Sequence, residues 1–534
     1  MKKHIKFIAV VTIAAAAAVL VGCNKEDSFL TGNSTGVCTY YQNTTTSRTN
    51  DAYVNCPEDD AIVLGDTIND PYRLENMQRA YDNIHDGNAP ISSVQANFRY
   101  VRILPESQEE LDAIERDTTI VLFDYPLHYK IAAWGSYYHD PSVNDSILTW
   151  LYSVVPINYE FPSGLNEELI YYVYIPPTEA KGDFYYLLEE EAYRVVGYKE
   201  DEDEEKAIMT TWIPSALIKG WDDVANRQVP IEGVKVIANY ITKIGTGITD
   251  ENGFCEINKN FIHKVHYRIK WESGFWDIRN GILGQAYYDG PTQKRAWNLE
   301  IAKNGKSILY ATVHKAAYKF FYGNRLGLRR PNLSYGKTKI SVYDRSAWWG
   351  TGCCWGTWSL LGIIPDINIA HPHTTNTDFV FGTAIHELGH QSHLLFIGKG
   401  TYIQLAKEIH ESWAAAIEWR LTNHFYNSEL GISYNYPYNY QGWHPGNKGN
   451  GKTSYYTPIF IDLMENYNQI ILGSNYPNDA ISGYNILYIQ NNIITNAYGL
   501  SSLHTALKNH KINGVTDIQI DNLMALYWNQ TYIR

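Results

Sequence analysis

The sequence has few cationic residues and no basic block. Lysine and arginine total 44 against 57 aspartate and glutamate residues, so the formal charge of the 534-residue chain is −13. A protein that binds nucleic acid needs a clustered cationic face. The composition therefore excludes nucleic acid as a partner.

Cysteine is scarce as well, and its spacing excludes the common cysteine-based metal sites. The six cysteines form no C-x-x-C pair and no zinc-ribbon pattern, so we assign none of them to a metal. Cys38 and Cys56 flank a polar loop and could pair in an exported chain, whereas Cys353 and Cys354 are adjacent. The sequence leaves the disulfide pattern open, and it leaves the oligomeric state open too.

The apolar content of the sequence excludes disorder of the whole chain. Apolar residues make up 45% of the sequence, which is enough to form large cores. At about 100–200 residues per domain, the length predicts three or four domains. The 43 tyrosines occur in every globular segment, so tyrosine alone does not mark a binding platform.

The N-terminus predicts export and lipidation. A short basic segment precedes an apolar run over 7–21, which is typical of a signal peptide. The run ends in Leu20-Val21-Gly22-Cys23, which resembles a bacterial lipobox. By that resemblance residues 1–22 are removed and Cys23 carries the lipid that contacts the membrane. Residues 24–27 resemble an export signal, so we expect an outer-membrane lipoprotein of the bacterial envelope, exposed at the cell surface.

Composition and patterning predict a multidomain α+β protein. Strands are expected over 119–123 and 169–175, and a helix over 108–115. Further helices are expected over 379–396, 402–424, 455–470 and 515–530. The expected segments are a lipoprotein signal peptide (1–22), a flexible tether (23–60), a β-rich N-terminal domain (61–215), a β-sandwich module (216–305) and a C-terminal α+β domain (306–534).

The expected β-sandwich module is based on a single pattern, an alternating strand that is followed by a turn. An alternating strand around Val234 and Val236 leads to the turn Thr249-Asp250-Glu251-Asn252-Gly253-Phe254. This pattern resembles the carboxypeptidase-regulatory-like β-sandwich over about 40 residues. We assign no chemistry to the module, because such modules usually brace a neighbour.

The catalytic signal is His386-Glu387-Leu388-Gly389-His390, an H-E-x-x-H motif. On an α-helix, positions i and i+4 lie about 40° apart around the axis and about 6 Å apart along it. Two imidazoles can therefore converge on one Zn²⁺ ion, with Glu387 beside them as the general base. A strand over 367–370 precedes the motif, and we expect it to form the edge of a sheet.

A catalytic zinc ion needs a third protein ligand. The next predicted helix offers Glu411, with Glu408 as the alternative. The small residues 414–416 would allow that helix to pack closely on the motif helix. His393 shares a face with His386 but lies a turn too far along the helix, so we interpret it as a supporting or core residue.

This arrangement resembles the gluzincin metallopeptidases, and loosely their enhancin-like, mucin-degrading branch. The resemblance covers about 40 residues and implies a zincin-like fold, with His386, His390 and Glu411 as zinc ligands. Thermolysin-type enzymes place an aspartate four residues after the glutamate ligand, where this sequence has Ala415. Another residue must then accept the hydrogen bond that orients a ligand histidine, and Glu418 is a candidate.

The expected donor to the reacting oxyanion lies in a later loop. Tyr455, Tyr456 and His444 flank a Gly/Asn-rich stretch over 446–451. A phenol or imidazole there could stabilise the developing charge, and we select Tyr456 and His444 as candidate catalytic residues.

The sequence therefore predicts a hydrolase: a surface-anchored zinc metallopeptidase that cleaves extracellular proteins or glycoproteins. The alternative is a surface lipoprotein that binds glycans or proteins on a degenerate zincin scaffold. The aromatic content of 14% and the β-sandwich module support this alternative. A purely structural envelope protein is the third possibility.

Overall fold

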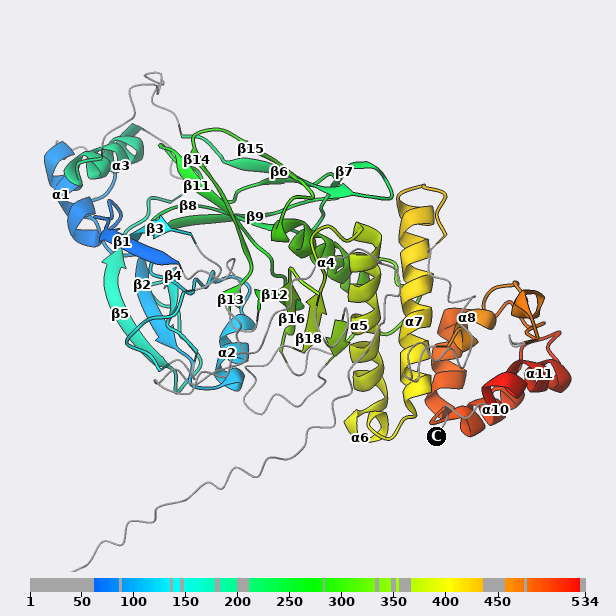
Figure 1. The fold of residues 1–534 in the computed structure, drawn as a ribbon. Coiled ribbons are helices and arrows are strands. Elements are labelled where there is room, and N and C mark those ends of the chain that lie inside the picture. The colour runs from blue at the N-terminus through cyan, green and yellow to red at the C-terminus, as the bar shows by residue number, and fades with distance from the viewer. Residues whose placement is uncertain are drawn as a thin grey trace, which may run out of the picture.

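The computed structural model describes residues 62–85, 89–134, 138–144, 148–177, 183–198, 211–281, 284–331, 336–346, 352–354, 366–435, 457–474 and 478–528. These residues form a mixed α+β fold, as the sequence predicts (Figure 1). The signal peptide, the tether and Cys23 lie outside the described residues. None of the described helices is long and apolar enough to cross a membrane.

The helices are unevenly distributed, with most of them in the C-terminal half. They are α1 (Leu74–Ile84), α2 (Gln108–Glu115), α3 (Asp183–Val195), α4 (Lys306–Phe321), α5 (Thr377–Ile397), α6 (Lys399–Tyr402), α7 (Lys407–His424), α8 (Ile459–Asp462), α9 (Ile486–Tyr488), α10 (Leu500–Asn509) and α11 (Asp517–Trp528).

The strands fall mainly before residue 302. They are β1 (Val63–Thr67), β2 (Phe98–Leu104), β3 (Tyr129–Ala133), β4 (Leu151–Pro156), β5 (Asn166–Val173), β6 (Ser215–Asp222), β7 (Arg227–Pro230), β8 (Lys235–Tyr240), β9 (Lys243–Ile248), β10 (Phe254–Glu256), β11 (Val265–Lys270), β12 (Trp276–Asn280), β13 (Gly284–Gln285), β14 (Tyr287–Gln293), β15 (Trp297–Ile301), β16 (Thr338–Tyr343), β17 (Gly352–Cys354) and β18 (Ile367–Ala370).

The N-terminal part contains a three-stranded sheet in the order β4-β2-β5 and a separate β1-β3 pair. Helices α1 and α3 pack side by side at its outer end (Figure 1). The helix expected over 108–115 is present as α2, but the strand expected over 119–123 is wrong. Asp117 accepts a hydrogen bond from the backbone N–H of Thr119 at 2.9 Å and forms a turn there. Only Phe123 makes a bridge, to Tyr152.

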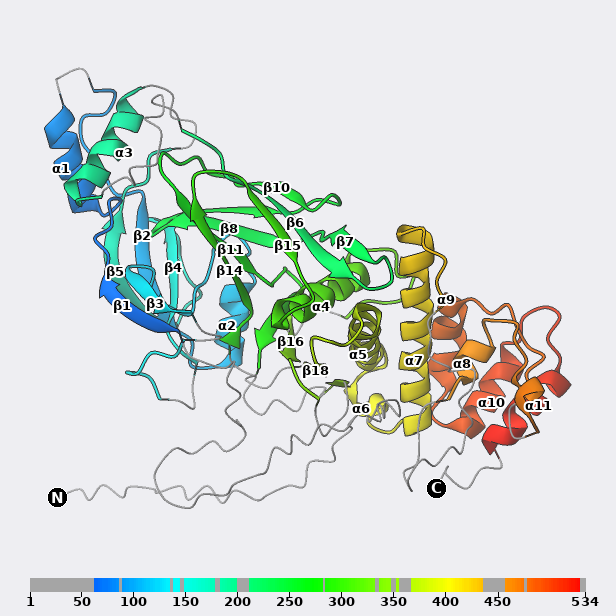
Figure 2. The same cartoon turned by 45° about the horizontal axis from the view of Figure 1, so that its top comes forward.

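The middle of the chain forms two four-stranded sheets, which Figure 2 shows between the N-terminal part and the helices. One has the order β10-β6-β15 with β7 on β6, and the other has the order β14-β11-β8-β9. The turn between β9 and β10 needs a glycine: Gly253 has a φ of +78°, and a Cβ there would lie 2.3 Å from the carbonyl oxygen of Ile218. Asp250 closes this turn by accepting the N–H groups of Asn252 and Phe254.

A fifth sheet packs against α4 and α5, in the order β13-β12-β16-β18-β17. The expectation that residues 367–370 form its edge is wrong, because β18 lies between β16 and the antiparallel strand β17. Strands β12 and β13 come from the expected sandwich module, yet β12 pairs in parallel with β16. The sheet thus takes strands from both sides of the boundary predicted at 305/306.

The C-terminal helices form a layer around α7. Helix α5 packs on α4 and on α7, while α8, α10 and α11 lie on the far side of α7 (Figures 1 and 2). The long helix expected over 455–470 is wrong, because only α8 and a 3-10 turn over Gln469–Leu472 form among its described residues. The side chain of Asn468 accepts the N–H of Ile470 at 3.0 Å, which favours a new helix start at this point.

Candidate metal centre

Helix α5 carries the H-E-x-x-H motif through the interior of the protein. Every residue from Thr377 to Leu394 except Phe379 is buried. The helix begins where the carboxylate of Asp223 accepts the backbone N–H of Thr377 at 2.9 Å. It ends at Gly398, whose φ of +84° turns the chain. The motif therefore lies on a buried helix and not on a solvent-exposed one.

Helix α7 lies beside α5 and presents small residues to its neighbours. Ala414, Ala415 and Ala416 are buried, and Gly389 of α5 faces Ile417 of α7. A Cβ at Gly389 would come within 3.3 Å of Cδ1 of Ile417. The close approach of the two helices, which the small residues allow, brings Glu411 to the motif.

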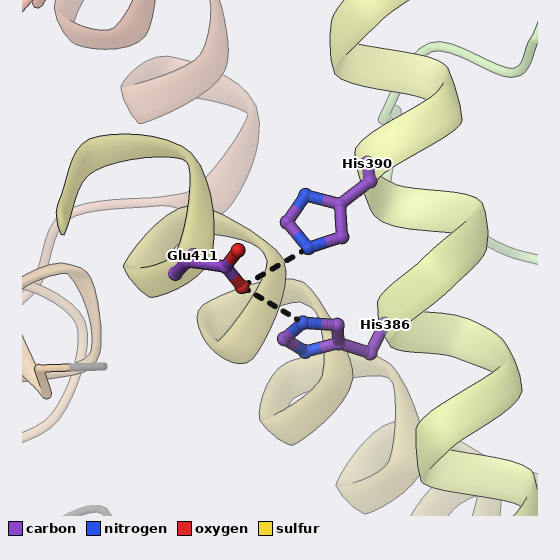
Figure 3. Close-up of side chains that lie close together, drawn as sticks. All are labelled: His386, His390 and Glu411. Atoms are coloured by element: carbon purple, nitrogen blue, oxygen red, sulfur yellow. Dashed lines mark ion pairs between the residues drawn. The ribbon is translucent and has the colours of Figure 1, made fainter. Parts of the chain in front are cut away.

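His386, His390 and Glu411 meet at one point (Figure 3). The Nε2 atom of His390 lies 3.2 Å from Oε2 of Glu411, and the Nε2 atom of His386 lies 3.6 Å from the same oxygen. The two imidazole centroids are 4.7 Å apart. Both rings thus direct the same type of nitrogen at one carboxylate oxygen.

These separations fit a tetrahedral metal ion. Ligand atoms about 2.0–2.1 Å from a tetrahedral zinc ion lie about 3.4 Å from one another. The two measured nitrogen–oxygen distances, 3.2 and 3.6 Å, bracket this value. The donor set of two imidazoles and one carboxylate also suits zinc. The residues present are therefore able to hold such an ion.

The outward nitrogen of each imidazole has its own partner. Nδ1 of His386 lies 3.0 Å from Oε2 of Glu418. Nδ1 of His390 lies 3.0 Å from the hydroxyl of Tyr402. When a histidine binds a metal through Nε2, its Nδ1–H usually donates to a group of this kind, which fixes the tautomer and the ring orientation. Both rings have this arrangement here.

The charges of the cluster are strongly coupled. Burial acts to raise the pKa of Glu411, but the neighbouring imidazoles of His390 and His386 outweigh it and hold this pKa well below its usual range. Burial acts to lower the pKa of His386, yet its hydrogen bonds to Glu411 and Glu418 raise this pKa overall. The carboxylates thus favour a positive charge at this point, and a metal ion would compete with protons for it.

The other residues predicted near the site differ in position. Glu387 is buried on α5 between the two histidines. Glu408 is buried in the first turn of α7 but is not part of the cluster of possible ligands, which includes Glu411 instead. His393 is buried against the ring of Tyr402, with a centroid distance of 5.4 Å. Neither of its ring nitrogens has a hydrogen-bond partner within the described part of the chain, and His393 is not in the cluster of possible ligands.

The candidate oxyanion donors Tyr455, Tyr456 and His444 lie outside the described residues. Thr457, which follows them, is fixed next to the site: its backbone N–H donates to Oγ of Ser412 at 2.9 Å. Ser412 adjoins Glu411 on α7. The proposed roles of Tyr456 and His444 remain predictions.

The sequence reasoning missed Tyr402. This residue ends the short helix α6, twelve positions after His390. No periodic pattern marks it, because it reaches the site through a turn of the chain and not along the face of a long helix. A tyrosine soon after an H-E-x-x-H helix is the weak signal that could have suggested it.

A second group of possible ligands lies elsewhere in the described part of the chain. It consists of Asp462, Glu465 and Asp479. Asp462 also accepts a hydrogen bond from the hydroxyl of Tyr527 at 3.0 Å. Asp462 and Asp479 are buried and Glu465 is partly buried, but a cluster of acidic residues alone indicates no metal site.

Comparisons with protein-family models, with curated proteins and with solved structures find no match to this chain. A function must therefore be argued from the site, and the site is a buried centre of two histidines and one glutamate that is able to hold a metal ion.

Proposed function

We propose that this protein is a zinc-dependent metallopeptidase of the gluzincin type. The observation that carries the proposal is the convergence of two Nε2 atoms on one oxygen of Glu411, at separations of 3.2 and 3.6 Å. The histidines flank Glu387 in an H-E-x-x-H helix, and this combination is typical of zinc peptidases.

A zinc ion bound here would polarise a peptide carbonyl and lower the pKa of a water molecule to about 7. His386, His390 and Glu411 would hold the ion, leaving one position of a tetrahedral site for water or substrate. Glu387 acts as the general base that accepts the proton of the attacking water. It then delivers this proton to the leaving amine as the C–N bond breaks.

The surroundings of the site suit this chemistry. Glu387 and the three ligand residues are each at most 2% exposed, so bulk water does not screen their charges. Electrostatic interactions are stronger in such a medium. Glu418 and Tyr402 lie at the outward nitrogens of the two imidazoles, and the inward nitrogens face Glu411.

The proposed substrates are extracellular proteins or glycoproteins. This part of the proposal depends on the lipobox ending at Cys23, which would anchor the enzyme to the outer membrane. An anchored peptidase meets substrates outside the cell, where it could cleave a peptide bond within a large chain.

The test uses the soluble chain without its signal peptide. Metal analysis should find about one zinc per molecule, and the protein should cleave members of a panel of caseins and mucins. Glu387→Gln should retain zinc but lose cleavage by at least about a hundredfold, as expected for loss of a general base. Glu408→Gln is the matched control, because Glu408 is a buried acid of α7 outside the ligand cluster.

Two results would overturn the proposal. If Glu387→Gln cleaves as fast as wild type does, Glu387 is not the general base. Glycan binding by a protein that holds no metal and hydrolyses nothing would instead favour the alternative, a binding lipoprotein on a degenerate scaffold. The aromatic content of 14% is the observation that favours this alternative.

A further inference from the structure

We infer that Tyr402 is a positioning residue for the metal ligand His390, an inference that rests on the proposed zinc site. The hydroxyl oxygen of Tyr402 lies 3.0 Å from Nδ1 of His390. With a metal ion bound at Nε2 of His390, the proton of the imidazole would lie on Nδ1, and the phenol oxygen would accept it. This hydrogen bond would hold the ring with Nε2 directed at the metal position beside Glu411.

Tyr402 is held firmly enough to do this. The backbone N–H groups of Thr401 and Tyr402 donate to the carbonyl of Gly398, at 3.1 and 3.0 Å. Gly398 directly follows α5, and its own N–H donates to the carbonyl of Leu394 at 2.9 Å. The residue that supports His390 is thus tied to the end of the helix that carries His390.

The phenol ring is also fixed from both sides by other rings. It meets His393 edge-on, with centroids 5.4 Å apart and planes at 84°. It lies against His410 at the same centroid distance, with a tilt of 40°. His410 in turn packs against His390 at 5.6 Å. This packing gives His393 and His410 a role that requires no metal contact: they limit the rotamers of Tyr402.

The two ligand histidines therefore receive different kinds of support. Glu418 is a carboxylate and adds a negative charge behind His386. Tyr402 is neutral and adds none behind His390. With Glu387, Glu411 and Glu418 ionised, a divalent cation would balance two of the three carboxylates. A further carboxylate in place of Tyr402 would add another uncompensated negative charge to a buried site, which is costly.

The test is a zinc-affinity measurement by competition with a chromophoric chelator, on apo protein titrated with zinc. Tyr402→Phe keeps the ring packing and removes the acceptor, so its zinc affinity should fall about 10–100-fold, the usual effect of losing such a partner. Tyr402→Gln, which restores an acceptor of neutral charge, should recover part of the loss.

Tyr434→Phe is the matched control. Its hydroxyl also bonds to α5, at Asp378 with a distance of 2.7 Å, but at the start of the helix and not at a ligand residue. It should leave zinc affinity unchanged. Circular dichroism and thermal unfolding of each apo variant show whether it has folded. If Tyr402→Phe misfolds, Tyr402→Gln is compared with wild type: a loss of less than about tenfold in zinc affinity supports the inference, and a loss beyond about 100-fold contradicts it.

The outcomes separate this inference from the proposed function. Equal zinc affinity of wild type and folded Tyr402→Phe, with wild type binding zinc, overturns the inference alone. A folded Tyr402→Gln that binds no better than Tyr402→Phe also overturns it, because the loss would then not come from the missing acceptor. A wild-type protein that binds no zinc overturns both proposals together.

Discussion

Glu418 lies 3.0 Å from Nδ1 of His386 and seven residues beyond Glu411 on helix α7. Seven residues are almost two full turns, so Glu411 and Glu418 share one face of the helix. Helix α7 thus places Glu411 at Nε2 of His386 and Glu418 at Nδ1 of the same ring. Ala415, in the position where thermolysin-type enzymes have a supporting aspartate, is buried without a polar side chain.

Glu418→Gln should weaken zinc binding about 10–100-fold, because an amide is a poorer acceptor for the Nδ1–H of His386 than a carboxylate. Chelator competition at neutral pH measures this loss. Glu408→Gln, on the first turn of the same helix, should bind zinc as wild type does. An affinity in Glu418→Gln equal to that of the control would show that the carboxylate does not support the ligand.

Zinc should stabilise the folded protein against heat. A ligand at a hundred times its dissociation constant adds about 2.7 kcal/mol when it binds only the folded state. Calorimetry of the apo protein with and without zinc should therefore show a higher unfolding temperature with the metal. Glu411→Ala should abolish most of this rise, and an undiminished rise in that variant would place the bound zinc elsewhere.

Gly253→Ala should destabilise the two four-stranded sheets by more than about 2 kcal/mol, since a non-glycine residue at positive φ already costs about 1–2 kcal/mol. The new Cβ would also lie 2.3 Å from the carbonyl oxygen of Ile218. Gly514→Ala is a control with a φ of +89° and open space around the added methyl group. Urea unfolding of both variants separates the steric effect from the backbone strain, and equal destabilisation would contradict the prediction.

Acid should destabilise the protein partly through His314. Burial lowers the pKa of this imidazole from 6.5 to about 4, and its Nε2–H donates to the carbonyl of Glu232 at 3.2 Å. Because the folded pKa is the lower one, its stabilising contribution is complete above pH 6.5 and is lost as the pH falls towards 4. The loss is at most about 3 kcal/mol for a shift of this size.

His314→Gln tests this pH dependence, because it keeps a donor for the Glu232 carbonyl and removes the titrating group. Urea unfolding at a series of pH values should show a shallower loss of stability between pH 6.5 and 4 in the variant than in wild type. Parallel curves for the two proteins would show that His314 does not contribute.

The sequence predicted the centre of the site well, because the information there is local. The spacing of His386 and His390 fixes their relative positions on a helix, and the small residues of α7 indicate where Glu411 would approach. The supporting role of Glu418 could also be predicted, since its separation from Glu411 places it on the same helix face. The position of Tyr402 could not be predicted, because it depends on the turn at Gly398, which no periodicity in the sequence encodes.

The errors in the fold arise from non-local pairing and from local polar competition. The pairing of β12 with β16 joins strands between which β13, β14, β15 and α4 lie in the chain, and nothing in either strand marks its partner. Residues 119–123 are apolar enough for a strand, but Asp117 forms a turn and only Phe123 pairs. The helix expected over 455–470 ends early, since α8 stops at Asp462, and the side chain of Asn468 bonds to the backbone at the start of the separate 3-10 turn over Gln469–Leu472.

The central claim is tested most directly by locating bound zinc through anomalous diffraction at the zinc absorption edge. We expect one strong peak about 2.0–2.2 Å from Nε2 of His386, Nε2 of His390 and a carboxylate oxygen of Glu411. A zinc peak at Asp462, Glu465 and Asp479 with none between the two histidines would contradict it.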